Sequence, residues 1–277
     1  MTFVRIGGVP HHVETDGSGP VCILSQGLGL CWFDWDPVVP LLAPHRTVVR
    51  FDRPGLGLSA PACAMPTLEG EAERIGQVLD ALGLAGPVTL VGHSLAGFHC
   101  EAFARRHPAR VAGLVLVDAS IEERPRVRKA AAARDACTRA CGAALARAGV
   151  ARALGPALRR AAVRASRHRG GDPAPDALVR AVYGTSRVFR AVIAENARYH
   201  DQAAELAALR RAGPLPSGLP VTVLAADPGD RYSARWLTRQ RALATELDAA
   251  YWISAPAGHM VMLDRPRDVA DAILATG

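Results

Sequence analysis

The sequence of 277 residues predicts an α/β protein in which helices flank a mostly parallel sheet and an all-helical unit is inserted. Up to residue 120, short apolar runs alternate with helix-forming stretches, which is typical of parallel strands joined by helical crossovers. Residues 121–216 contain no strand-like run, and the alternation then resumes. We therefore assign 1–120 and 217–277 to one core domain and 121–216 to a helical cap over the carboxyl edge of the sheet.

Each element of the core is predicted from its local pattern. Short apolar runs indicate strands, and apolar residues at helical spacing bounded by Gly or Pro indicate helices. In chain order we expect a hairpin over 3–13, a strand at 21–25, a helix at 36–42, a strand at 46–52, a helix at 68–82, a strand at 87–91, a helix at 98–106 and a strand at 111–117; after the cap come a strand at 221–226, a helix at 234–247, a strand at 250–254 and a helix at 266–275.

The strand at 21–25 runs directly into the turn Gln26–Gly27–Leu28–Gly29. A glycine-bearing turn after an inner strand can present backbone N–H groups to a ligand, because no side chain shields them. Trp32 and Phe33 follow this turn in the chain. We expect them either to line a substrate pocket or to fasten the next helix to the sheet.

The strand at 87–91 ends in a sharp turn with one serine, Gly92–His93–Ser94–Leu95–Ala96–Gly97, and a helix follows. This context raises the oxygen of Ser94 above the carboxyl edge of the sheet, as a nucleophile elbow requires. Small residues must flank the serine, since strand and helix pass close together. The strict Gly-x-Ser-x-Gly pattern would have glycine where this chain has Ala96. The alternative role of Ser94 is a simple helix cap.

A serine hydroxyl is a poor nucleophile at neutral pH, so a histidine and a carboxylate are expected in neighbouring loops at the same sheet edge. His259 lies in the loop after the last strand and fits the role of the base. His93 also lies at a strand-to-helix turn, but it precedes the serine, so its side chain should point away from the elbow. A lone histidine in such a loop is otherwise a surface or core residue.

The net charge of +7 is distributed unevenly. Residues 119–216 hold 19 Arg and Lys against 8 Asp and Glu, whereas the rest of the chain is acidic. Arginines on Ala-rich helices usually point to water, so a solvated face is expected rather than a nucleic-acid surface. The alternative is a field that draws anionic substrates to the serine, and its strongest candidates are Arg159, Arg160, Arg164 and Arg167.

Other features of the sequence limit the possible location and partners of the protein. No apolar run reaches the length of a membrane span, and the first twenty residues lack the apolar stretch of a secretory signal. The six cysteines show no metal-ligand or disulfide-framework spacing, and Cys137 and Cys141 are expected to be buried thiols. We therefore expect a cytoplasmic protein with a small-molecule substrate, no metal, no organic cofactor, and no nucleic-acid or membrane partner. The oligomeric state is not predicted.

Four motifs together resemble the α/β-hydrolase superfamily, and the resemblance covers essentially the whole chain. They are specific for the fold and say little about the substrate. The motifs are Asp52–Arg53–Pro54–Gly55–Leu56–Gly57–Leu58–Ser59, Gly92–His93–Ser94–Leu95–Ala96–Gly97, Leu114–Val115–Leu116–Val117–Asp118–Ala119–Ser120, and Gly258–His259 with Leu263–Asp264–Arg265–Pro266.

The resemblance implies a Ser-His-Asp triad with Ser94 as nucleophile and His259 as base. The backbone amides of Leu28 and Leu95 would form the oxyanion hole, although Gln26 stands where the family usually has histidine. Most members place the acid after the strand that follows the cap, where this chain has Asp227 and Asp230. A minority place it before the cap, where this chain has Asp118. The residues around Asp118 look more like that minority, so Asp118 is favoured, with Asp230 as the alternative and Asp227 third.

Three functions are compatible with this sequence. The first is a serine hydrolase that cleaves a small ester, lactone or thioester through an acyl-enzyme. The second uses the same triad as a general base without an acyl-enzyme, as lyases and cyclases on this fold can. The third is a non-catalytic receptor that has kept the pocket. An intact serine, histidine and carboxylate set disfavours the third.

Overall fold

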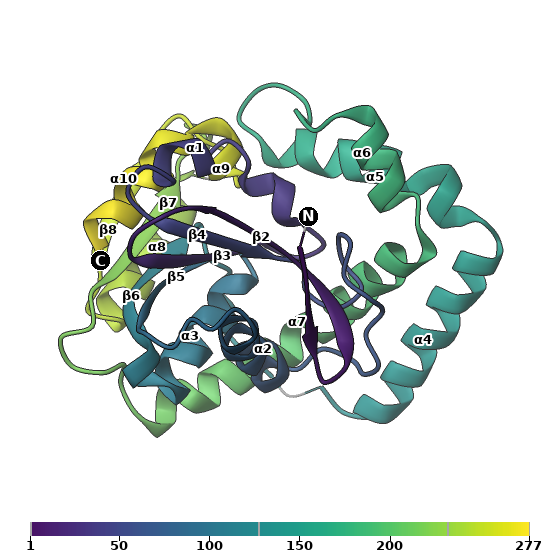
Figure 1. Cartoon of the computed structure of the whole chain (residues 1–277), viewed down its shortest axis with the longest axis horizontal. Helices are drawn as coiled ribbons and strands as arrows, with labels where there is room; N and C mark the ends of the chain where they lie inside the picture. Colours follow the sequence, from purple (N-terminus) through teal and green to yellow (C-terminus); the bar gives the residue numbers. More distant parts are fainter. Residues whose placement is uncertain (1, 127, 232, 277) are drawn as a thin grey trace.

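The computed structural model describes residues 2–126, 128–231 and 233–276, and within them eight strands form one sheet (Figure 1). The strands are β1 (Thr2–Ile6), β2 (Val9–Gly17), β3 (Val21–Ser25), β4 (Thr47–Phe51), β5 (Val88–His93), β6 (Val111–Val117), β7 (Val221–Ala226) and β8 (Ala250–Ser254). Their order is β1-β2-β4-β3-β5-β6-β7-β8. β2 pairs antiparallel with β1 and β4, and the remaining pairings are parallel. The predicted α/β fold with a mostly parallel sheet is confirmed.

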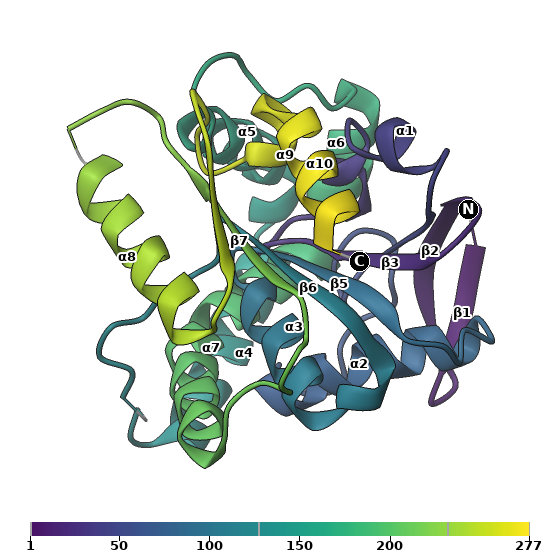
Figure 2. The same ribbon diagram turned by 90° about the vertical axis from the view of Figure 1, so that its left-hand side faces the viewer.

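Helices cover both faces of this sheet. On one face pack α2 (Leu68–Ala81), α3 (Ala96–Arg106) and α8 (Ser233–Glu246); on the other pack α1 (Val39–Leu42), α9 (Val261–Asp264) and α10 (Pro266–Thr276). Figure 2 shows the central strands between α2 and α3 on one side and α10 on the other. Because both faces are covered, the inner strands are buried on both sides. This explains why they are continuous apolar runs rather than alternating ones.

Between β6 and β7 the chain forms α4 (Ala131–Arg147), α5 (Val150–Ser166), α6 (Asp176–Tyr183) and α7 (Ser186–Ala212). All four helices fall in the segment predicted as the cap, and its described residues include no strand. In Figure 1, α4, α5 and α6 arch along the right of the molecule. A separate apolar cluster joins α6 and α7 to the core. It contains Cys31, Trp32, Phe33, Leu56, Val179, Val182, Tyr183 and Val188.

Most predicted strand bounds are confirmed, and those at 21–25, 221–226 and 250–254 match residue for residue. The helix expected at 36–42 is shorter. A 3-10 turn at Trp32–Trp35 is followed by α1 from Val39 only. Pro37 and Pro40 explain this difference, because proline has no N–H to donate and disfavours helical backbone in the residue before it.

The expectation that Cys137 and Cys141 are buried is wrong. Both thiols are exposed on α4, with their sulfur atoms 3.9 Å apart. Helix α4 packs mainly against α7 and also contacts α5, and the i,i+4 pair lies on its exposed side. Among the described residues, no helix combines the length and the apolar character that a membrane crossing requires.

Candidate active site

Ser94 sits in a strained turn between β5 and α3. Its φ of 52° lies in the left-handed region, which non-glycine residues rarely occupy. The two flanking glycines are required by the close packing. A Cβ on Gly92 would lie 2.6 Å from the carbonyl oxygen of Ala96, and one on Gly97 would lie 2.8 Å from Cβ of Ala119. The chain therefore has the strand–turn–helix geometry that the sequence predicts, and Ala96 fits where the strict pattern has glycine.

Asp118 follows β6 and contacts His259 from the loop after β8. Its Oδ2 lies 2.6 Å from Nδ1 of His259. Its Oδ1 accepts hydrogen bonds from the backbone N–H of Ala226 at 2.9 Å and from Nε1 of Trp236 at 2.7 Å. The carboxylate is only 2% exposed and is surrounded by donors, so its position and its role as an acceptor are fixed.

The other two candidate aspartates bond within their own loop. Asp227 Oδ1 accepts the N–H of Gly229 at 2.8 Å, and Asp230 Oδ1 accepts the N–H of Ser233 at 3.0 Å. Both contacts are ordinary turn chemistry, in which an aspartate accepts from a backbone N–H a few residues further on.

Ser94 and His259 line the same cavity, although the serine is not yet bonded to the imidazole. In the described part of the chain, Oγ of Ser94 has one side-chain neighbour within hydrogen-bond reach, Oγ of Ser120 at 3.4 Å. Hydrogen bonds between catalytic groups are often long before substrate binds, so this geometry is compatible with a serine–histidine pair.

His93 lies beneath His259 and supports its loop. The two rings are 4.7 Å apart at their centroids, and Nε2 of His93 lies 2.9 Å from the backbone oxygen of His259. Burial, together with the nearby His259, holds the pKa of His93 well below its ordinary value. The ring is therefore neutral, with its proton on Nε2, and donates to that oxygen. Sequence reasoning placed His93 away from the elbow but did not predict this contact.

The turn Gln26–Gly29 closes the cavity beside the serine. Leu28 and Gly29 are among the lining residues, and Leu95 is the first residue after Ser94. In the described part of the chain, the backbone N–H groups of Leu28 and Leu95 donate to no protein acceptor. Two free amides from the turn after β3 and from the elbow are what an oxyanion hole in this fold consists of.

Trp32 and Phe33 do not line this cavity, which corrects their assignment as substrate-binding residues. They are 7% and 5% exposed and pack edge to face, with centroids 5.0 Å apart. Trp32 also packs against His12, and Phe33 against Tyr183 of the cap. The other role expected of them is to fasten the next helix to the sheet, whereas these contacts join the segment to β2 and to the cap.

The cavity has a volume of about 320 Å³ and mainly apolar walls. Among the described residues that line it, Arg159 has the one permanently charged side chain. Its guanidinium forms ion pairs with Asp34 and, at 3.1 Å, with Asp172. It also stacks over the rings of Tyr183 and Phe33. Two buried carboxylates thus balance this cation. The apolar part of the wall comes from Leu28, Leu30, Leu158, Ala162, Val163, Val188, Phe189, Val192 and Met260.

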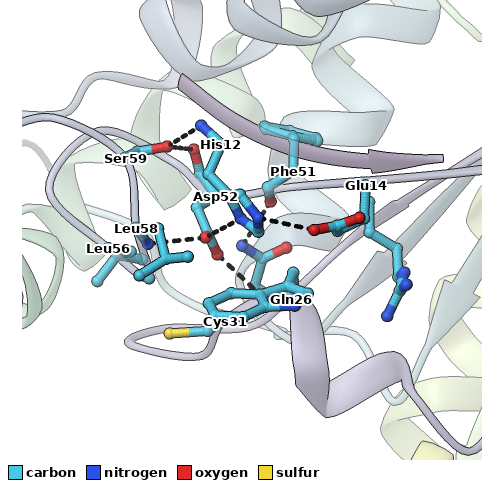
Figure 3. Close-up of polar contacts among 12 residues, drawn as sticks. His12, Glu14, Gln26, Cys31, Phe51, Asp52, Leu56, Leu58 and Ser59 are labelled. Carbon is cyan, nitrogen blue, oxygen red and sulfur yellow. Dashed lines mark hydrogen bonds and ion pairs between the residues drawn. The ribbon is translucent and has the colours of Figure 1, made fainter. Parts of the chain in front are cut away.

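Asp52 anchors the loop after β4 (Figure 3). Its carboxylate lies 2.8 Å from Nδ1 of His12 and accepts the backbone N–H groups of Trp32 and Leu58, each at 3.0 Å. The hydroxyl of Ser59 donates to the backbone oxygen of Asp52 at 2.6 Å. The sequence predicts a rigid turn here, but its partners on β2 and near Trp32 are known only from the structure.

A parallel α/β sheet, a strained serine elbow, an Asp–His contact at the same sheet edge and a helical insertion define the α/β-hydrolase class. The family model described as "Alpha/beta hydrolase family" matches residues 19–272, so the chain belongs to the alpha/beta hydrolase family. Among the described residues, no group of three His, Cys, Asp or Glu side chains could hold a metal ion.

Curated relatives are similar over part of the chain. A 2-hydroxy-6-oxo-2,4-heptadienoate hydrolase of Pseudomonas putida is 36% identical over 121 residues, 42% of this chain and 44% of that protein. RutD of Variovorax paradoxus, named for carbamate hydrolysis, is 37% identical over 139 residues, 48% of this chain and 52% of that protein. The chain thus spans about half the length of the relatives it matches.

The solved structure of Cfl2 from Burkholderia cenocepacia has the same fold. It is 20% identical, the comparison covers 99% of this chain and 94% of that one, and the TM-score is 0.78. At this identity the likeness concerns the fold alone. The family model therefore shows membership of the alpha/beta hydrolase family, and the reaction must be argued from the site.

Proposed function

We propose that this protein is a serine hydrolase that cleaves a small, neutral carboxylic ester, lactone or thioester through an acyl-enzyme. The observation that carries the proposal is the 2.6 Å contact between Asp118 and His259 beside the cavity that Ser94 also lines. The roles we assign are nucleophile for Ser94, general base and acid for His259, and orienting carboxylate for Asp118.

The reaction begins with proton transfer from the Ser94 hydroxyl to Nε2 of His259, while Oγ attacks the substrate carbonyl carbon. Asp118 accepts from Nδ1–H, which keeps Nε2 free to take that proton. The carbonyl oxygen becomes an oxyanion and accepts hydrogen bonds from the amides of Leu28 and Leu95. The intermediate collapses as His259 returns the proton to the leaving alkoxide or thiolate. Water, activated by His259, then attacks the acyl-enzyme and releases the carboxylic acid and Ser94.

The lining of the cavity supports a neutral substrate. Its walls are mainly apolar, and the charge of Arg159 is already balanced by Asp34 and Asp172. An anionic substrate group in this cavity would lose its hydration without gaining an unpaired cation. Burying an ion in this way costs on the order of several kcal/mol. An apolar acyl or alcohol group would instead gain about 25 cal/mol for each Å² that it buries.

The relative from Pseudomonas putida favours a second candidate substrate. A 6-oxo-dienoate has no ester bond, so its hydrolysis breaks a carbon–carbon bond beside a carbonyl, and the molecule also carries a carboxylate. The same triad could serve that reaction, but the balanced Arg159 offers no free cation for the carboxylate. We therefore rank this candidate below a neutral ester. The general-base reaction without an acyl-enzyme is the third candidate.

Two measurements test the proposal. Incubation with a small alkyl fluorophosphonate, followed by mass spectrometry of peptides, should label Ser94, whereas Ser94→Ala should stay unlabelled. A panel of p-nitrophenyl esters, a matched hemisuccinate ester and 2-hydroxy-6-oxo-2,4-heptadienoate should then show the highest kcat/KM with a neutral apolar ester, and acid quenching should trap an acyl group on Ser94. No labelling of Ser94 would refute the proposal. Faster turnover of the dienoate than of every ester would replace it with carbon–carbon bond hydrolysis.

A further inference from the structure

The backbone groups of the turn Gln26–Gly29 are held by two partners from the cap and one from the core. Arg53 donates through Nη1 to the backbone oxygen of Gln26 and through Nη2 to that of Gly27, the latter at 2.8 Å. Glu195 accepts the N–H of Gly29 at 2.8 Å, and the hydroxyl of Tyr183 donates to the backbone oxygen of Gly29 at 2.9 Å. The N–H of Leu28 is thus left free while its surroundings are fixed.

Two donors to the carbonyl of Gly27 determine the direction of that free N–H: Nη2 of Arg53 at 2.8 Å and the backbone N–H of Leu30 at 3.2 Å. The carbonyl of Gly27 and the N–H of Leu28 belong to one planar trans peptide, so they point in opposite directions. Because Arg53 and Leu30 hold the carbonyl of Gly27, the N–H of Leu28 must point away from these two donors. The positive charge also polarises this peptide, which makes the N–H a better donor.

Glu195 in turn holds Arg53. Its Oε1 lies 2.6 Å from Nε of Arg53, while its Oε2 accepts from Gly29. The two side chains are buried, with Arg53 1% and Glu195 5% exposed. Without this carboxylate the buried guanidinium would lose its hydrogen-bonded ion-pair partner, which is strongly destabilising. The carboxylate comes from α7 of the cap and lies 142 residues from Arg53 in the sequence.

We propose that the cap completes the oxyanion hole, with Glu195 and Tyr183 as positioning residues that orient the amide of Leu28 through Arg53 and Gly29. This inference rests on the proposed serine hydrolase function. It goes beyond that function because it makes the cap a part of the catalytic framework. Docking of the cap on the core and assembly of the oxyanion hole are then one event, and loosening these contacts slows the chemical step rather than substrate binding.

The sharpest test is Glu195→Gln, which introduces glutamine. It has the shape of glutamate, but it offers one acceptor oxygen and one donor amide where two donors, Arg53 and Gly29, converge. Tyr183→Phe removes only the hydroxyl and keeps the ring over Arg159. The matched control is Glu101→Gln. Glu101 is a buried carboxylate of α3 that binds Arg210 of α7 at 2.6 Å, so it also joins cap and core but contacts neither the elbow nor the turn.

The readout is phosphonylation of Ser94 by a small fluorophosphonate, whose phosphoryl oxygen occupies the oxyanion hole. We expect the maximal inactivation rate to fall about 30- to 100-fold in Glu195→Gln and about tenfold in Tyr183→Phe, on the scale of a lost oxyanion donor. The half-saturating probe concentration should change little, and Glu101→Gln should react like the unmodified protein. Thermal unfolding measured in parallel should show comparable destabilisation in Glu195→Gln and Glu101→Gln.

The outcomes separate this inference from the function on which it rests. If Ser94 of the unmodified protein is not phosphonylated, the proposed function is wrong and this inference with it. If it reacts, and both Glu195→Gln and Tyr183→Phe react at the same rate, the inference alone is refuted. If Glu195→Gln does not fold, Tyr183→Phe decides the question, because it removes no charge and only the contacts of the hydroxyl with the backbone oxygen of Gly29 and with Sγ of Cys31.

Discussion

Replacing Asp118 by asparagine exchanges an acceptor-only group for one that must also donate. Three donors converge on this carboxylate: Nδ1 of His259 on Oδ2, and the N–H groups of Ala226 and Trp236 on Oδ1. If the amide oxygen stays with Ala226 and Trp236, the amide NH₂ faces His259. Nδ1 must then be unprotonated, so Nε2 carries the hydrogen and cannot take the proton of Ser94.

The opposite orientation of the amide is disfavoured. It would place the NH₂ group against two buried donors, and each unsatisfied donor costs about 1–3 kcal/mol. In Asp118→Asn, His259 is therefore held in the tautomer that carries its hydrogen on Nε2. We expect kcat/KM for a neutral ester to fall about 10⁴-fold, equivalent to about 5.5 kcal/mol of transition-state stabilisation, with the fold intact.

Steady-state ester hydrolysis measures this loss, and thermal unfolding checks the fold. The control is Asp230→Asn, whose carboxylate accepts the N–H of Ser233, and it should stay within about threefold of the unmodified enzyme. Activity of Asp118→Asn within about tenfold of the unmodified enzyme would refute the reasoning. A large loss in Asp230→Asn alone would transfer the orienting role to that residue.

Three further outcomes are expected. Ser94→Ala and His259→Ala should each lower ester hydrolysis by about 10⁴ or more, and the double variant should be little worse, because the residues act as a unit; additive losses would contradict this. Burial, only partly offset by Arg53, raises the pKa of Glu71 from 4.5 to about 7. The folded state therefore binds this proton more tightly than the unfolded state, and the free energy of unfolding falls as the pH rises from about 4.5 to about 7. In denaturant titrations Glu71→Gln should raise the free energy of unfolding by about 1–3 kcal/mol at pH 8 and leave it unchanged at pH 4. Equal stabilisation at both pH values would exclude this origin. Raising salt from about 0.1 to about 1 M should change kcat/KM alike for a neutral and an anionic ester of equal length, since steering by exposed charge would slow only the anionic one.

The core could be predicted because its signals are local. Buried strands of a parallel sheet are continuous apolar runs, and glycines mark the places where chain segments approach closely. Gly92 and Gly97 are examples, since a side chain on either would collide with the neighbouring backbone or with Ala119. Helix α2 likewise begins where Thr67 caps it, with Oγ1 of Thr67 accepting the N–H of Gly70 at 3.0 Å.

The walls of the cavity could not be predicted, because they depend on pairs far apart in the chain. Arg159 meets Asp34 across 125 residues, and nothing in the sequence of either helix indicates that partner. Without it, Arg159 looks like one more solvated arginine of an Ala-rich helix. Trp32 and Phe33 were ambiguous for the same reason: an aromatic residue beside a pocket and one beneath it have identical local patterns, and only the packed cap distinguishes them.

The cap also holds the loop of His259, and one of its arginines takes part in this contact. Asp264, next to the loop of His259, accepts from Nε of Arg167 at 2.7 Å, from the backbone N–H of His168 at 2.7 Å and from that of Gly258 at 2.9 Å. The N–H of Met260 donates to the backbone oxygen of Ser166, at the end of α5, at 3.0 Å. The end of α5 thus fastens the loop of His259, while α7 fastens the turn of Leu28.

The arginines at these contacts between cap and core form ion pairs with carboxylates and are not free to bind an incoming substrate. Arg159 is paired with Asp34 and Asp172, and Arg167 with Asp264. A pair of opposite charges has a much weaker distant field than a single charge, so these arginines contribute little to steering. They contribute geometry instead, because a planar guanidinium holds its partners in fixed directions. A basic cap of this kind is expected over a site that recognises its substrate by shape and apolar contact.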